Sequence, residues 1–133
     1  MFDLPRHRGR RVLLFVVAAF FVFAGVSHFT NAEFFVSIVP AYLPAPHALV
    51  VISGVFEVLG GLGVLLAATR KWACWGLIAL LVAVYPANIH MAMHPELFPE
   101  MSPGALYARL PIQFLFAWCV WWSTRPDAPA SGA

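Results

Sequence analysis

Four long apolar segments limit what this chain can fold into more than any other feature of its sequence. They cover residues 12–29, 48–68, 72–93 and 105–122. A helix needs roughly 20 mostly apolar residues to cross the hydrocarbon core of a bilayer, which is about 30 Å thick. The segments are continuously apolar, whereas strands of a membrane barrel alternate. The sequence therefore predicts an all-α fold, an integral membrane four-helix bundle in one domain over residues 1–133.

The composition agrees with a lipid environment. Hydrophobic residues make up 62% of the 133 residues and charged residues only 11%, whereas soluble domains carry about 25% charged residues. So few charges cannot cover the surface of a soluble domain of this length. We expect the lipid bilayer to surround the chain, and we expect no nucleic-acid partner.

The basic residues fall on alternate connections between the apolar segments. Residues 1–11 contain four arginines, Arg70 and Lys71 separate the second and third segments, and Arg125 follows the fourth. The connections 30–47 and 94–104 contain no Lys or Arg. Because Lys and Arg mark the cytoplasmic side of a membrane protein, this distribution predicts a multi-pass protein with both termini in the cytoplasm.

The first outer connection has a pattern of its own. Asn31 is a helix-capping residue before an apolar face, and three prolines follow it. We expect a short interfacial helix over residues 31–39, acting either as a simple lid or as a gate over a pocket. The Pro-, Ala- and Ser-containing tail, residues 126–133, is predicted to be disordered.

Polar side chains inside the apolar segments gather in the outer half of the predicted bundle. At about 1.5 Å per residue, Glu57 and Gln113 lie about 13 Å from the outer boundary. The side chains of Ser53, Asn88 and Arg109 lie about 7 Å deep, with His28 near the outer mouth. We expect Glu57 to pair with Arg109, since they are the only opposite charges inside the segments, and we expect the two to bond also with Asn88 or Gln113.

This polar layer has two interpretations. It is either a structural network that fixes helix register or a pocket for the head of an amphiphile such as a quinone. In the pocket, Glu57 and His28 would handle protons as the catalytic residues. The ligand-binding residues would be Ser53, Asn88, Arg109 and Gln113.

Glycines in the apolar segments predict close helix contacts, because small residues let helix backbones approach each other in membranes. Four lie in the second segment, and Gly25 and Gly76 lie in the first and third.

A second candidate site lies at the outer end of the third segment. His90 and His94 are one helical turn apart, with methionines beside them. Imidazole and thioether groups are ligands for copper, so metal handling at the outer face is an alternative function. The other interpretation is that these are ordinary interfacial side chains.

Several short motifs in a fixed order give the chain a resemblance to a known family. They are the runs AGVSHF at 24–29, SGVFEVLGG at 53–61, PANI at 86–89 and RLPIQ at 109–113. With FF at 34–35 and LPAP at 43–46, they closely resemble the DoxX-like family of small bacterial membrane proteins. The resemblance covers nearly the whole chain from the first apolar segment to the fourth.

The resemblance implies a four-helix bundle in the bacterial inner membrane. The family takes its name from a subunit of a thiosulfate:quinone oxidoreductase, and relatives are associated with membrane redox systems. It therefore implies quinone as a cofactor and membrane redox subunits as partners. It transfers no catalytic residues, so the chain is either an enzyme or a non-enzymatic scaffold or assembly subunit, of unassigned oligomeric state.

Overall fold

The computed structural model describes residues 1–132 and is helical, with no strand in that range. The elements are α1 (Arg8–Thr30), α2 (Ala32–Ser37), α3 (Pro46–Gly63), α4 (Arg70–Met93), the 3₁₀ turn η1 (Pro95–Leu97) and α5 (Pro103–Thr124). The all-α prediction is thus confirmed. The short helix expected over 31–39 is present as α2.

The second predicted helix is shorter than its apolar run suggested. The sequence predicted a helix over residues 48–68, but α3 ends at Gly63 and a turn leads to α4. Side chains at the start of α4 donate hydrogen bonds to carbonyl groups at the end of α3, which in a longer helix would accept from backbone N–H groups. The Thr69 hydroxyl donates to Gly63 O at 2.8 Å, and Arg70 Nε donates to Val64 O at 2.7 Å. These contacts cap the carboxyl end of α3.

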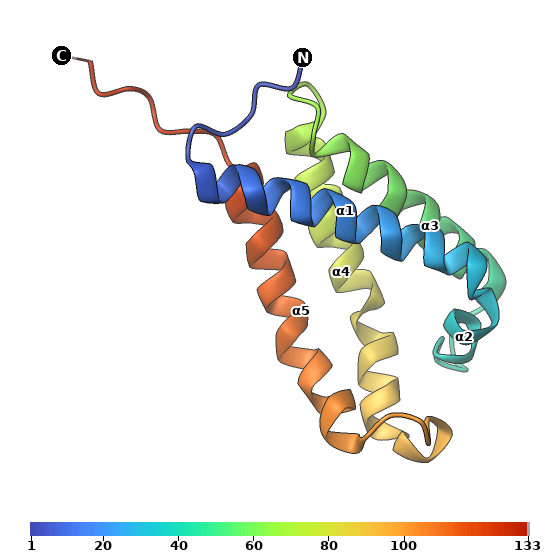
Figure 1. The fold of residues 1–133 in the computed structure, drawn as a ribbon. Coiled ribbons are helices and arrows are strands. Elements are labelled where there is room, and N and C mark those ends of the chain that lie inside the picture. The colour runs from blue at the N-terminus through green and yellow to red at the C-terminus, as the bar shows by residue number, and fades with distance from the viewer. Residues whose placement is uncertain (133) are drawn as a thin grey trace.

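The four long helices form a ring in which each packs against two others. Helix α1 lies between α3 and α5, and α4 also lies between α3 and α5, so α3 and α5 face each other across the ring. Figure 1 shows the pair α1 and α3 converging with the pair α4 and α5 near the two termini and diverging away from them.

Two apolar clusters fill the ring. The larger one lies nearer the termini and includes Leu14, Phe21, Leu77, Leu81 and Val120. The smaller one joins the loop after α2 to the far ends of α4 and α5. Its members are Ile38, Met91, Ala92, Phe98 and Leu106. The segment around α2 therefore closes the end of the ring opposite the termini.

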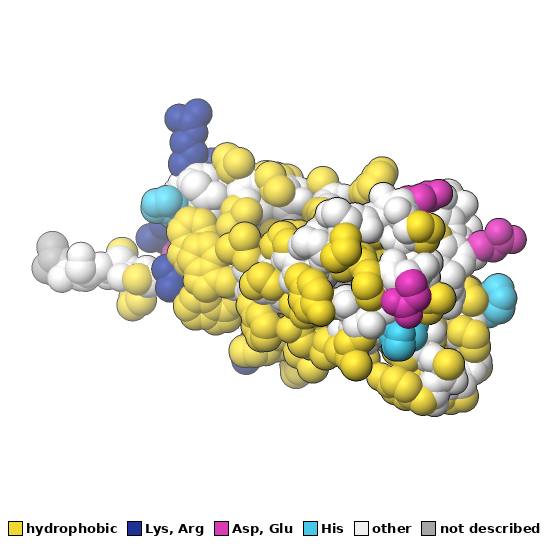
Figure 2. Space-filling view, turned by 90° about the horizontal axis from the view of Figure 1, so that it is seen from below, with side chains coloured by type: hydrophobic (Ala, Val, Ile, Leu, Met, Phe, Trp, Pro, Cys, Tyr) yellow, Lys and Arg dark blue, Asp and Glu magenta, His cyan; other side chains and the backbone are white. Residues whose placement is uncertain are grey.

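Three helices are long and apolar enough to cross a membrane. They are α1, α3 and α4, and α5 is not among them. Much of the outward surface is apolar, including Phe23, Phe56 and Val82. Figure 2 shows most Lys and Arg side chains gathered toward one end and acidic side chains toward the other, with a mostly hydrophobic surface between them. Both aspartates, Asp3 and Asp127, lie at the basic end. This distribution is typical of a membrane protein.

Glycine brings α1 and α3 into backbone contact. A Cβ added at Gly25 would lie 2.7 Å from the backbone oxygen of Gly54, and one added at Gly61 would lie 2.9 Å from the backbone oxygen of Ala18. Backbone atoms in packed helices cannot move aside, so these positions require glycine. Gly76 is different, because an added Cβ there meets nothing within 4 Å. The expectation of a packing role for Gly76 was therefore wrong.

The substitution Gly25→Ala tests this contact. We expect it to destabilise the purified protein by about 1–3 kcal/mol through overpacking. Gly76→Ala is the matched control. We expect it to change the free energy of unfolding by less than about 1 kcal/mol, or to raise it slightly because Ala has the higher helix propensity. Melting temperatures in one detergent compare the two variants. Equal values for Gly25→Ala and Gly76→Ala would contradict the close α1–α3 contact.

A buried arginine ties the first helix to the tail that follows the last one. Arg10 Nη1 lies 2.6 Å from Asp127 Oδ1, and Arg10 Nε donates to Trp122 O at 2.9 Å. Arg10 Nη2 also donates to Arg125 O, and the Arg6 backbone N–H donates to Asp127 Oδ2 at 2.9 Å. The described tail residues 126–132 contain no helix, but these bonds hold Asp127 in place.

The tie predicts a pH-dependent contribution to stability. The hydrogen bond from the Arg6 backbone, followed by the charge of Arg10, lowers the pKa of Asp127. A carboxylate with a lowered folded-state pKa stabilises above its unfolded value, about pH 4, and loses that effect as the pH falls through the folded value. We expect Asp127→Asn to lower the melting temperature at pH 7, with the deficit disappearing in acid. The exposed Glu33 provides the control, Glu33→Gln, which should match wild type at both pH values.

Candidate functional site

The centre of the candidate site is a contact between a histidine of α1 and a glutamate of α3. His28 Nδ1 lies 2.7 Å from Glu57 Oε2, and both side chains are buried. The glycine contact explains this placement, since a Cβ added at Gly54 would lie 2.8 Å from His28 Cβ. Glu57 follows Gly54 by three residues on the same face of α3. The glycine that lets the helices approach thus also brings the imidazole and the carboxyl together.

An aromatic ring from α2 covers the histidine. The Phe35 ring centroid lies 4.0 Å from that of His28, with the planes inclined by 32°. Phe35 also packs against the apolar cluster at the far ends of α4 and α5. The short helix after α1 therefore shields the buried pair.

One oxygen of the buried carboxyl group lacks a hydrogen-bond partner. His28 Nδ1 is 3.0 Å from Ala24 O, a helical carbonyl one turn earlier, and forms its hydrogen bond there. Glu57 Oε2 is close to the same nitrogen, yet it has no hydrogen bond to any of residues 1–132. A buried acceptor without a donor is costly. A donor from a bound molecule at this oxygen would remove that cost.

A second polar cluster joins α4 to α5. Arg109 Nε donates to Asn88 Oδ1 at 3.3 Å, and Asn88 Nδ2 donates to Gln113 Oε1 at 2.5 Å. Gln113 Nε2 in turn donates to Leu81 O at 2.7 Å. The chain of bonds ends one residue before the carbonyl of Val82, whose normal helical donor is missing because Pro86 has no N–H. This network ties two proline-containing helices together.

The expected ion pair between Glu57 and Arg109 is absent from residues 1–132. Glu57 contacts His28 and Arg109 contacts Asn88, because α3 and α5 are on opposite sides of the ring. Ser53 belongs to neither cluster, since its hydroxyl donates to Val50 O within its own helix. The polar layer thus consists of two clusters, one on each helix pair.

A groove on the outer surface of α4 and α5 reaches the second cluster. Its volume is about 310 Å³. It is lined by Ile78, Leu81, Val82, Tyr85, Pro86, Gln113, Phe114 and Ala117. Gln113 is the one amide in a lining that is otherwise aliphatic or aromatic. An amphiphile in the surrounding apolar phase would reach the Arg109–Asn88–Gln113 network by this route.

The proposed metal ligands are neighbours, but they do not form a larger donor set. The rings of His90 and His94 have centroids 4.7 Å apart, and His94 Nδ1 lies 3.2 Å from Glu96 Oε1. Met91 and Met101 pack into the apolar cluster instead. Within residues 1–132 there is no group of three or more His, Cys, Asp or Glu placed to hold a metal ion.

The comparison with known families places the chain in a group without an assigned activity. A family model described as "Domain of unknown function (DUF8561)" matches residues 17–124. The chain belongs to the DUF8561 family. The DUF8561 match contains α3, α4, α5 and most of α1, and so includes both polar clusters. No curated protein and no solved structure matches the chain.

Prediction from the sequence found the polar residues and the contact of Arg109 with Asn88, but it did not pair His28 with Glu57. It placed His28 at the mouth and Glu57 deep, because it measured depth along each helix separately. The signal for their pairing was the glycine spacing, in which Gly25 precedes His28 by three residues as Gly54 precedes Glu57. Phe35 carried no polar signal and was missed.

Double-mutant cycles test this division into two clusters. Asn88→Ala and Gln113→Ala should each destabilise the protein, with a coupling energy of about 0.5–3 kcal/mol because the two side chains are bonded. Glu57→Gln and Arg109→Gln should be additive within about 0.5 kcal/mol, since their groups share no partner. Reversible unfolding of the purified protein measures both cycles. A large coupling energy between Glu57 and Arg109 would contradict this division and would indicate that the two side chains form a direct ion pair.

Proposed function

We propose that this chain is a DoxX-like inner-membrane protein that acts as a redox-linked membrane component and binds a quinone-like amphiphile in its polar layer. The observation that carries the proposal is the unpartnered Glu57 Oε2 beside His28 in a buried site. A quinol hydroxyl is a donor of the kind that this oxygen lacks. The resemblance to DoxX-like proteins, which remains a prediction, favours the same ligand class.

The proposal includes four membrane spans, with α5 as the fourth. Helix α5 has 22 residues, enough for about 33 Å. It exposes Ile112, Phe114 and Leu115. Its costly polar groups, Arg109 and Gln113, bond toward α4. Both termini lie in the cytoplasm in this proposal, since the basic residues gather at the end where the chain starts and finishes.

In the proposed site the two clusters have different roles. Glu57 and His28 hold and release the protons that accompany quinone reduction, because a carboxyl group and an imidazole side by side offer both a donor and an acceptor. Arg109 and Gln113 bind ligand oxygens, and Asn88 fixes their orientation. Electrons come from a membrane redox partner subunit, while this chain supplies binding and proton transfer.

Ligand-induced stabilisation tests the proposal. The probes are decylubiquinone and its quinol, added to the purified full chain in a mild detergent. We expect the quinol to raise the melting temperature of wild type, since a ligand that binds only the folded state stabilises it. Glu57→Gln should weaken quinol binding about tenfold, which corresponds to about 1.4 kcal/mol for one lost hydrogen bond.

The variant His90→Ala/His94→Ala is the matched control and should keep the quinol effect. Arg109→Lys, which keeps the charge but loses the Nε donor to Asn88, is a second test should Glu57→Gln fold poorly. The absence of any wild-type shift at saturating quinol would refute the proposal. A copper titration compares wild type with the His90→Ala/His94→Ala variant. Equal copper affinity in the two proteins would exclude metal handling by these histidines.

A further inference from the structure

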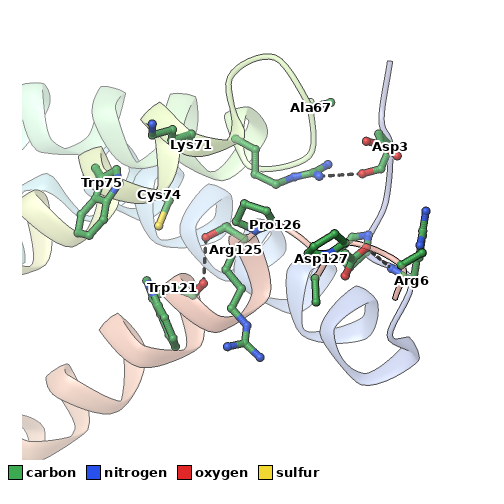
Figure 3. A pocket seen from close by; sticks show the side chains of 16 residues that line it. Asp3, Arg6, Ala67, Lys71, Cys74, Trp75, Trp121, Arg125, Pro126 and Asp127 are labelled. Carbon is green, nitrogen blue, oxygen red and sulfur yellow. Dashed lines mark hydrogen bonds between the residues drawn. The ribbon is translucent and has the colours of Figure 1, made fainter. Parts of the chain in front are cut away.

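A second cavity, remote from the polar layer, lies at the end of the molecule where both termini emerge. Its volume is about 600 Å³. It is bounded by the N-terminal segment, the turn before α4, the first turns of α4, the end of α5 and the tail (Figure 3). In the sequence, its basic residues indicated only the topology. Three stretches that are distant in the sequence, residues 3–6, 67–75 and 121–130, thus build one pocket.

The lining of this cavity is cationic. Four basic residues, Arg6, Arg70, Lys71 and Arg125, line it together with two acidic residues, Asp3 and Asp127. The carboxylate of Asp127 is already bonded to Arg10 and to the Arg6 backbone. Its negative charge is therefore largely compensated.

The basic residues of the lining differ in whether they are free to bind a ligand. Arg70 is occupied, since its guanidinium donates to the backbone oxygens of Asp3, Val64 and Leu65. Lys71 and the Arg125 guanidinium have no hydrogen bond or ion pair to any group within residues 1–132. Arg125 packs against an aromatic ring, with its guanidinium carbon 5.3 Å from the Trp121 ring centroid, as its side chain beside Trp121 indicates in Figure 3. Lys71 and Arg125 are therefore available to an anion, as is Arg6, whose guanidinium likewise has no hydrogen bond or ion pair within residues 1–132.

Tryptophans place the pocket at the depth of lipid head groups. Trp75 and Trp121 line it, and each is exposed over 40% or more of its surface. Exposed tryptophans at the ends of apolar helices mark the boundary between hydrocarbon and water. An anion bound by Lys71 and Arg125 would lie at this boundary, where phospholipid phosphates are found.

The apolar groove of α4 and α5 continues from the same tryptophans. Ile78 and Val82 follow Trp75 by three and seven residues, and Ala117 and Phe114 precede Trp121 by four and seven. These spacings keep the residues on one face of each helix. A charged pocket and an apolar groove are thus aligned along the seam between α4 and α5, as an amphiphile with an anionic head requires.

We propose that this seam binds an anionic phospholipid, with its head group in the cationic pocket that Lys71 and Arg125 line and an acyl chain in the groove lined by Val82 and Phe114. The head group of this lipid lies at the opposite end of the bundle from the proposed quinone site, although the acyl chain uses the same groove of α4 and α5. The proposal does not require quinone binding, because its tests use only lipids, head-group anions and pocket variants.

Titration with defined lipids tests the proposal. The full-length protein in a nonionic detergent is titrated with dioleoylphosphatidylglycerol, and binding is followed by tryptophan fluorescence and melting temperature. We expect saturable binding with a rise in melting temperature. Dioleoylphosphatidylcholine, which has the same chains but no net charge, should bind at least fivefold more weakly. Equal binding of the two lipids would overturn the proposal.

Charge variants separate a pocket from general surface attraction. Lys71→Gln and Arg125→Gln should each weaken phosphatidylglycerol binding about fivefold, the loss that corresponds to about 1 kcal/mol for one cation near an anionic lipid. Arg8→Gln is the matched control, since Arg8 is exposed near the same end but does not line the cavity. It should change binding less than twofold. An equal loss in all three variants would mean nonspecific attraction and would refute the pocket.

Two further experiments distinguish binding of a lipid from binding of a free anion. Inorganic phosphate and glycerol 3-phosphate carry the head-group chemistry without acyl chains, and we expect neither to reproduce the melting shift at millimolar concentration. Val82→Trp fills the groove at an exposed position and should weaken phosphatidylglycerol binding while Lys71 and Arg125 are intact. A full shift with glycerol 3-phosphate, or unchanged lipid binding by Val82→Trp, would exclude the acyl groove.

Discussion

The backbone contact between α1 and α3 is the constraint on which the rest of the structure depends. Glycines at 25, 54 and 61 let the two helices approach until carbonyl oxygens of one helix lie against the backbone of the other. Helices in lipid gain little from burying apolar side chains, so close packing of this kind has to hold them together. The contact also determines chemistry, because only at this separation does the imidazole of His28 reach the carboxyl group of Glu57.

The ring arrangement explains why the polar residues divide into two clusters. Each cluster lies within one helix pair, His28 with Glu57 in the first and Asn88 with Arg109 and Gln113 in the second. The hydrogen bonds of the second cluster satisfy groups that would be costly in hydrocarbon. The first cluster leaves one buried oxygen without a donor. A purely structural network explains the second cluster well and the first poorly, and that difference favours a site at Glu57.

The sequence predicted the elements better than their contacts. Apolar length located the long helices, and Asn31 located the start of α2, although its side chain makes no capping hydrogen bond there. The same counting extended α3 to residue 68, because apolar length contains no information on side-chain capping by Thr69 and Arg70. Counting depth along each helix also paired Glu57 with Arg109. It could not show that their helices are opposite each other, since the order of helices around a ring depends on long-range packing rather than on local pattern.

The bonds of Arg10 have a consequence for the order in which the chain is assembled. Arg10 is synthesised 112 residues before Trp122 and 117 residues before Asp127, whose carbonyl and carboxylate are its acceptors. Until translation reaches residue 127, a guanidinium destined for a buried position has no acceptor and has to remain in water. The amino-terminal turn of α1 therefore completes its packing only after α5 has been synthesised. Closure of the ring at this end thus requires all four long helices to be present.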